Sequence, residues 1–176
     1  MRGRLKAEQR LRRLVEDVLV GCGFSEAYTW SLQASDRDPA ALTVPEPISA
    51  ELAVLRTTLL DGLIASARHN LDLGADRIAL FELAHVYLPT EAALPDEGWR
   101  VGGIVEGGFF RAKGAVETIF EALEAEPSFE PAQHPFMSTP ASAKVPGGWV
   151  AQLDPSRLDG EWGVFELDLA EVFARV

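Results

Sequence analysis

The residues of this chain with the most obvious chemical potential are carboxylates placed within apolar stretches. Glu82 lies inside the mostly apolar run from Ile78 to Tyr87. A buried carboxylate there needs a partner, because an unpaired charge is unfavourable away from water. Arg56 or Arg77 would supply the partner. We interpret Glu82 as half of a structural ion pair in preference to a catalytic group.

Glu166 and Asp168 form a second carboxylate pair, two residues apart in the segment Gly163 to Leu169. Residues with this spacing in a strand lie on the same face, so the pair could hold a metal or act as an acid and a base. A solvent-facing strand edge is the favoured interpretation.

The other reactive side chains show no pattern of a site. His69, His85 and His134 have no metal-ligand spacing with each other or with the single cysteine, and we expect no metal site. The lone Cys22 allows no internal disulfide, which indicates a reducing compartment and predicts a cytoplasmic protein. The glycine pairs at 102–103 and 107–108 lack the spacing of a phosphate-binding loop.

The charge of the chain bears on its partners. A formal net charge of -11 opposes nucleic-acid binding, which requires a surplus of Lys and Arg. Contacts with any nucleic acid, RNA included, are therefore expected to be weak or absent. The only basic concentration is residues 2–13, which is either an RNA contact or, as we prefer, a solvated helix face or a chain boundary. No apolar run is long enough to span a membrane.

Hydrophobic periodicity predicts three helices: Ala7 to Val20, a central helix that starts after Thr57 and Thr58 and ends at Gly74, and Phe110 to Glu124. The expected strands are Phe24–Leu32, Ala41–Val44, Ile78–Tyr87, Trp99–Glu106, Ser128–Pro131, Ser142–Val145, Trp149–Leu153 and Gly163–Leu169. Few helices among many consecutive strands predict one α+β domain over residues 1–176, with a largely antiparallel sheet.

The order of several short segments resembles the bacterial phenylalanyl-tRNA synthetase beta subunit. Residues 54–87 resemble its helix LRTSLLPGLL…N followed by the strand LFEIG.VF. The other matching segments are the entry at 10–31, Pro47 to Glu51, Gly108 to Glu117, His134-Pro135 and Phe165 to Leu169. The chain departs from the family pattern at Asp61, Gly108, Phe136-Met137 and Ala151 to Asp154.

This resemblance implies the inner part of a longer beta subunit, a class II aminoacyl-tRNA synthetase-like domain without catalytic activity. It also implies an alpha subunit as partner in an (αβ)2 assembly that charges tRNA with phenylalanine. No cofactor is expected in this chain, since ATP and magnesium are used by the whole enzyme. In keeping with this, Leu80 to Leu83 carry no arginine where an active class II enzyme binds the ATP α-phosphate. No Gly-rich segment ending in Glu-Arg, which would supply the arginine for the γ-phosphate, appears near the carboxyl end.

The central helix is apolar around more than one face, which predicts that more than its own sheet must cover it. The expected subunit-interface residues are Leu55, Arg56, Leu59, Leu60, Leu63, Ile64 and His69, with Phe109 and Phe110 as further candidates. The rival hypothesis is a free-standing synthetase-like paralogue, an enzyme or small-ligand-binding protein with a pocket near Glu82, Glu166 and Asp168.

Overall fold

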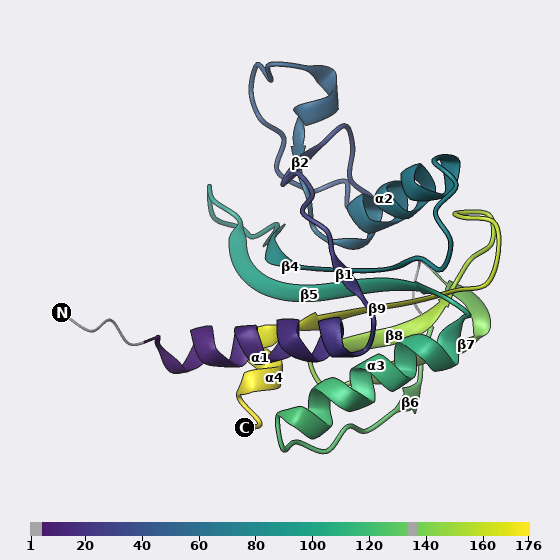
Figure 1. The fold of residues 1–176 in the computed structure, drawn as a ribbon. Helices are drawn as coiled ribbons and strands as arrows, with labels where there is room; N and C mark the ends of the chain where they lie inside the picture. The colour runs from purple at the N-terminus through teal and green to yellow at the C-terminus, as the bar shows by residue number, and fades with distance from the viewer. Residues whose placement is uncertain (1–4, 134–136) are drawn as a thin grey trace.

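A computed structural model describes residues 5–133 and 137–176 of the chain (Figure 1). Among these residues, seven strands form one sheet in the order β1-β4-β5-β9-β8-β7-β6. Their bounds are β1 Ser25–Glu26, β4 Ala79–Leu88, β5 Asp96–Glu106, β6 Glu130–Pro131, β7 Met137–Val145, β8 Gly148–Leu153 and β9 Trp162–Asp168. Only β1 and β4 pair in parallel; the other pairs are antiparallel, which confirms the predicted α+β class with a mostly antiparallel sheet.

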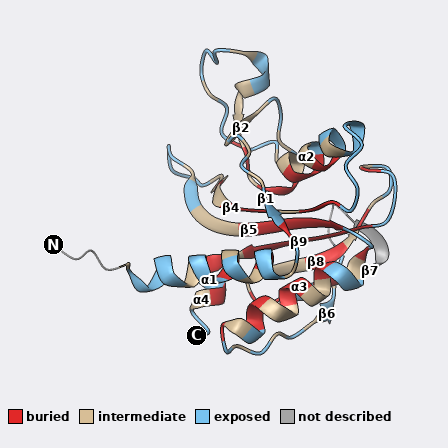
Figure 2. Ribbon diagram, in the orientation of Figure 1, coloured by how far each residue is buried: buried red, intermediate tan, exposed pale blue. Residues whose placement is uncertain are grey.

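Helices cover both faces of this sheet (Figure 1). The helices α1 (Ala7–Gly21), α3 (Phe109–Ala122) and the short α4 (Leu169–Phe173) lie on one face, and α2 (Leu60–Asp72) lies on the other. Each face has its own apolar core, one centred on Phe81, Phe120 and Phe165 and the other on Leu59, Leu63 and Ile104. The buried positions therefore follow the central strands and the inner sides of α2 and α3 (Figure 2).

The predicted helices are confirmed to within a few residues, and the end of α2 shows why. Gly74 adopts a left-handed conformation with φ 79° just after the last turn. The backbone N–H of Ala75 donates to Asn70 O and that of Gly74 donates to Leu71 O. These bonds satisfy the last carbonyls of the helix in the way that favours glycine at this position.

The predicted strand from Phe24 to Leu32 was wrong in its extent. Only Ser25–Glu26 pair with the main sheet, and the chain then leaves it to form β2 (Leu32–Gln33), which pairs with β3 (Val54–Leu55). The expected strand at Ala41–Val44 is reduced to one bridge between Thr43 and Val54. With the 3-10 turn η1 (Ala50–Leu52), this region projects from the sheet beside α2 (Figure 1). We call residues 27–57 the arm.

Small residues allow the central strands to pack tightly. Gly102 lies directly beneath α2, where an added Cβ would be 3.1 Å from the Cβ of Leu59. A Cβ on Gly103, on the opposite face, would overlap the ring of Phe165. In the part of the chain that the structure describes, no helix combines the length and apolar character needed to cross a membrane.

Two glycine substitutions test this packing. A Cβ at Gly163 would overlap the carbonyl oxygen of Gly108, whereas a Cβ at Gly114, inside α3, meets nothing within 4 Å. We expect Gly163→Ala to lower the free energy of unfolding by about 1–3 kcal/mol through overpacking. The matched Gly114→Ala should raise it by about 0.5–1 kcal/mol by favouring the helix. Urea denaturation measures both, and a change of the same sign in the two variants would contradict the packing described.

Candidate functional site

Glu82 is the centre of a buried ion pair that joins the arm to the sheet. Its side chain is 1% exposed, and its Oε1 lies 2.9 Å from Nη1 of Arg56, which is 4% exposed. The backbone N–H and the hydroxyl of Thr29 also donate to this carboxylate, at 3.2 and 2.6 Å. Arg56 in turn donates through Nε to the carbonyl of His85 at 3.0 Å. The predicted pairing with Arg56 is confirmed, whereas Arg77 is exposed in the turn before β4.

Glu166 joins the start of α2 to the middle of the sheet. Its Oε2 accepts hydrogen bonds from the Thr58 hydroxyl at 2.5 Å and from the Leu59 backbone N–H at 2.9 Å. Its Oε1 lies 3.1 Å from Nη1 of Arg100. The carboxylate therefore holds the segment that leads into the helix, where backbone N–H groups lack partners within the helix.

The prediction of a solvent-facing edge for Glu166 and Asp168 was wrong. Strand β9 is central in the sheet, between β5 and β8, and Glu166 is 2% exposed. Asp168 is partly accessible, lies 3.8 Å from Nη2 of Arg100, and accepts bonds from the N–H groups of Ala170 and Glu171 at the start of α4. The two carboxylates share one guanidinium and do not form an open acid–base pair.

Burial affects the ionisation of Glu166. Removal from water raises the pKa of the Glu166 carboxyl above its ordinary value, and the Thr58 hydroxyl, Arg100 and the Leu59 N–H act in the opposite direction. Burial also raises the pKa of Asp61, and Arg37 opposes this change. Asp61 is ion-paired with Arg157 at 2.5 Å, so this departure from the family pattern fastens the first turn of α2 to the loop after β8.

The two glutamates lie in one row across the sheet, since Glu82 and Glu166 are both register partners of Gly102. The space above Gly102 is occupied by Leu59 and Leu63 of the α2 region. Both carboxylates are thus saturated by protein donors beneath a layer of leucine. The depressions beside the row are lined by Thr29 and Arg56 and not by either glutamate, which argues against the pocket that the rival hypothesis requires.

The histidines are separated by the fold. His69 is exposed on α2, and the ring of His85 lies 4.1 Å from that of Trp99, with an interplanar angle of 46°. His134 lies outside the described residues. Within residues 5–133 and 137–176, no three His, Cys, Asp or Glu side chains are grouped in a way that could hold a metal ion.

The most exposed feature near this network is an aromatic pair that the sequence interpretation missed. Thr29 points inward to Glu82, so its neighbours Tyr28 and Trp30 point outward and are 93% and 80% exposed. We call Tyr28 and Trp30 the aromatic ridge. A depression of about 440 Å³ on one side reaches His85 and Trp99, and one of about 470 Å³ on the other reaches His69 on α2. The alternation of polar and apolar residues at 24–32 predicted a strand, and that prediction assigned no surface role to Tyr28 or Trp30.

The apolar stripe of α2 is covered by the chain itself. Leu59, Leu60 and Leu63 are 0% exposed and Ile64 is 4% exposed, all packed in the core between α2 and the sheet. Leu158, in the loop after β8, and partly buried Ala27 of the arm pack in the same core, so the cover beyond the sheet comes from the chain itself. An interface role for the nominated residues stays a prediction, and the accessible members are Leu55, His69, Phe109 and Phe110. Phe110 is 82% exposed and makes an edge contact with Phe109 at 5.4 Å between ring centroids.

Comparison with known proteins identifies the family. The family model described as "Phenylalanyl tRNA synthetase beta chain CLM domain" matches residues 1–169. The chain belongs to this family. The resemblance seen in residues 54–87 and the collinear segments is therefore confirmed.

Similar proteins agree with this family. The phenylalanine–tRNA ligase beta subunit of Thiobacillus denitrificans is 34% identical over 93% of this chain, and that of Bacillus thuringiensis subsp. konkukian is 31% identical over 98%. The chain spans only about a quarter of these relatives, 24% and 26% of their lengths.

Solved structures share the fold. Desulfitobacterium hafniense PylSc, a pyrrolysyl-tRNA synthetase, superimposes with a TM-score of 0.74 at 16% identity, covering 94% of this chain and 65% of that one. A second structure of the pyrrolysyl-tRNA synthetase from the same organism gives 0.70 at 17% identity, covering 94% and 68%. The CLM domain thus has a synthetase-like fold.

The direction of the Glu166 pKa predicts a pH dependence. The folded chain keeps the Glu166 proton at a higher pH than the unfolded chain, whose carboxyl titrates near 4.5. Stability of the parent should therefore fall, relative to Glu166→Gln, as the pH rises through 4.5 and past the folded pKa. The measurement is the free energy of unfolding of both proteins from pH 4 to 7.

Asp154→Asn is the control with the opposite sign. Hydrogen bonds from Ser156 lower the pKa of Asp154, so the parent should gain stability relative to this variant as the pH rises. Two outcomes would refute the assigned direction of the Glu166 pKa. One is the same pH dependence of the stability difference from the parent in both variants. The other is a parent that becomes more stable relative to Glu166→Gln as the pH rises.

Proposed function

We propose that this chain is a non-catalytic, class II synthetase-like domain of a phenylalanine–tRNA ligase beta subunit. Its role is to scaffold the alpha subunit that charges tRNA with phenylalanine, using ATP and magnesium. The main support is the row Glu82–Gly102–Glu166. Protein groups donate hydrogen bonds to both of its carboxylates, and leucine side chains cover Gly102. A reacting adenylate needs open space and free cationic donors, and this row offers neither.

The arginines near the row support the same conclusion. Stabilising a transferring phosphoryl group requires guanidinium or metal charge directed at the phosphate. Arg56 is occupied by Glu82 and by the carbonyl of His85, and Arg100 lies between Glu166 and Asp168. These guanidiniums neutralise protein carboxylates in place of substrate phosphates. We accordingly assign no ATP or magnesium site to this chain.

The aromatic ridge is the surface that we assign to the partner subunit. Exposed tryptophan and tyrosine are enriched among the residues that contribute most to protein–protein binding. Thr29 is held by Glu82 on the inner side, so Tyr28 and Trp30 remain fixed outward without a partner present. His69, from the original interface set, lines the depression beside the ridge. Recognition of tRNA is assigned to other parts of the enzyme, because the net charge of -11 repels phosphate.

The absence of catalysis is tested directly by pyrophosphate exchange. The isolated chain, given ATP, magnesium and phenylalanine, should exchange no labelled pyrophosphate above the enzyme-free blank, since Arg56 and Arg100 near the row are already paired with Glu82, Glu166 and Asp168. A complete phenylalanine–tRNA ligase serves as the positive control. Exchange by the isolated chain above the blank would overturn the non-catalytic assignment.

Assembly is tested by substitution in the ridge. Trp30→Ala should weaken binding of a phenylalanine–tRNA ligase alpha subunit by about 2 kcal/mol or more, roughly 30-fold, as measured by sedimentation. Leu94→Ala is the matched control, because Leu94 is similarly exposed at 75% but lies in the loop before β5. Equal binding by the parent and Trp30→Ala, both folded by circular dichroism, would show that the ridge is not the docking surface.

A further inference from the structure

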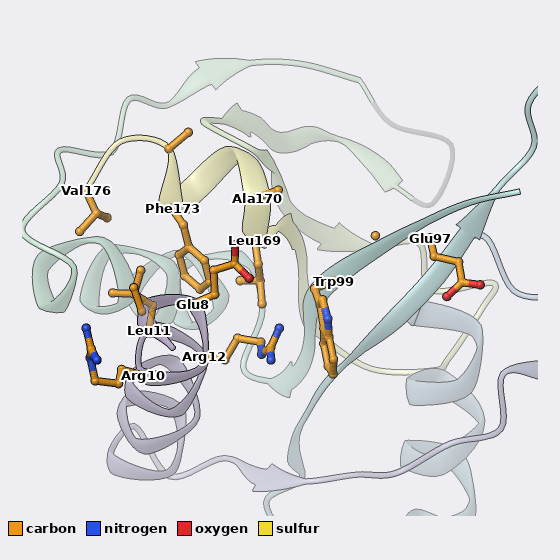
Figure 3. Close-up of a pocket in the computed structure, with 13 residues that line it drawn as sticks. Glu8, Arg10, Leu11, Arg12, Glu97, Trp99, Leu169, Ala170, Phe173 and Val176 are labelled. Carbon is orange, nitrogen blue, oxygen red and sulfur yellow. The ribbon is translucent and has the colours of Figure 1, made fainter. Parts of the chain in front are cut away.

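A second candidate site lies on the opposite face of the sheet from the carboxylate row, between α1, α4 and the start of β5 (Figure 3). The cavity has a volume of about 710 Å³, within the range of small-molecule sites. Its apolar walls are Leu11, Trp99, Leu169 and Phe173, which come from three separate elements.

Arg12 gives this apolar cavity a polar recognition group. Its guanidinium lies over the Trp99 ring, 4.1 Å from the centroid, and both side chains line the cavity (Figure 3). Within the described residues, the Arg12 guanidinium makes no hydrogen bond or close ion pair, and its charge interacts only at longer range with Glu16, one turn along α1. The stack holds the planar group in place while its N–H edges stay unused, and such an edge suits the two oxygens of a carboxylate.

The charges around the cavity limit the class of ligand. Arg10 and Arg12 line it together with Glu8 and Glu97, so the cavity is locally neutral in a chain with net charge -11. Arg10 already donates to the carbonyl of Leu5, which leaves Arg12 as the principal anion donor. Two nearby glutamates disfavour a doubly charged phosphate more strongly than a single carboxylate, since the repulsion grows with the charge of the ligand.

We propose that this cavity binds a small amphipathic monocarboxylate, with the carboxylate on Arg12 and a flat apolar body against Trp99, Leu169 and Phe173. In this proposal, one arginine of the basic amino-terminal helix binds a ligand, whereas the sequence analysis favoured a solvated helix face. The cavity shares Trp99 with the depression beside the aromatic ridge, whereas Arg12 and α4 line the cavity alone. Ligand binding there does not depend on the proposed assembly function.

The test is titration of the 176-residue chain with 1-naphthylacetate, its neutral amide 1-naphthylacetamide and inorganic phosphate, followed by the NMR shift of the Trp99 indole N–H. Trp99→Phe assigns that signal. The acid should bind and shift it, the amide should bind about tenfold more weakly, and phosphate should not bind. Arg12→Gln should lower the affinity for the acid about tenfold, as for the loss of one charge-assisted contact.

Arg13→Gln is the matched control, because it removes the same charge from an exposed neighbour on α1 that does not line the cavity. It should change the affinity less than twofold, and the NMR spectrum of each variant reports whether it is folded. An equal loss of affinity for the acid in the two folded variants would show that net charge, and not a contact with Arg12, drives binding, and would overturn the proposal. Equal binding of acid and amide, absence of binding by the acid, or Arg12-dependent binding of phosphate in its place would each overturn the proposal.

Discussion

The burial of two carboxylates in the middle of the sheet constrains the rest of the structure. A carboxylate removed from water is strongly unfavourable unless donors surround it, and removal of one partner from a buried pair typically costs about 3–5 kcal/mol. Glu82 takes its donors from Arg56 and Thr29, and Glu166 takes its donors from Thr58, Leu59 and Arg100. Both ends of the arm and the start of α2 are therefore fixed to the central strands.

The same bonds separate this domain from a working synthetase active site. In a catalytic sheet, charged side chains must remain free to meet the substrate, whereas here Glu82 is paired with groups of the arm and Glu166 with Arg100 and the start of α2. Leu59 and Leu63 then close over Gly102, which has no side chain to prevent the approach. These contacts hold the arm, and with it the aromatic ridge, against the sheet.

A small ion-pair network links the elements on the two faces of the sheet. Arg100 contacts Glu166, whose partners are at the start of α2, and also Asp168, which caps α4. Helix α4 supplies Leu169 and Phe173 to the cavity beside Trp99. The carboxylate row and the candidate ligand cavity thus lie on different faces but share a structural support.

The sequence alone predicted the helices and the need of a buried charge for a partner. It did not predict how distant segments pair. The period of Leu59, Leu63 and Ala67 predicted α2, Gly74 predicted its end, and Glu82 within an apolar run predicted a cationic partner that proved to be Arg56. These features depend on neighbours along the chain, or on the requirement that a buried charge has a partner.

The order of the strands in the sheet follows from neither of these. Because β9 inserts between β5 and β8, Glu166 is central and not at an edge, and because Thr29 bonds to Glu82, Tyr28 and Trp30 turn outward. The cavity beside Trp99 likewise required the tertiary structure, since its walls are more than 150 residues apart in sequence at Leu11 and Phe173 and meet only when α1 and α4 pack on the same face.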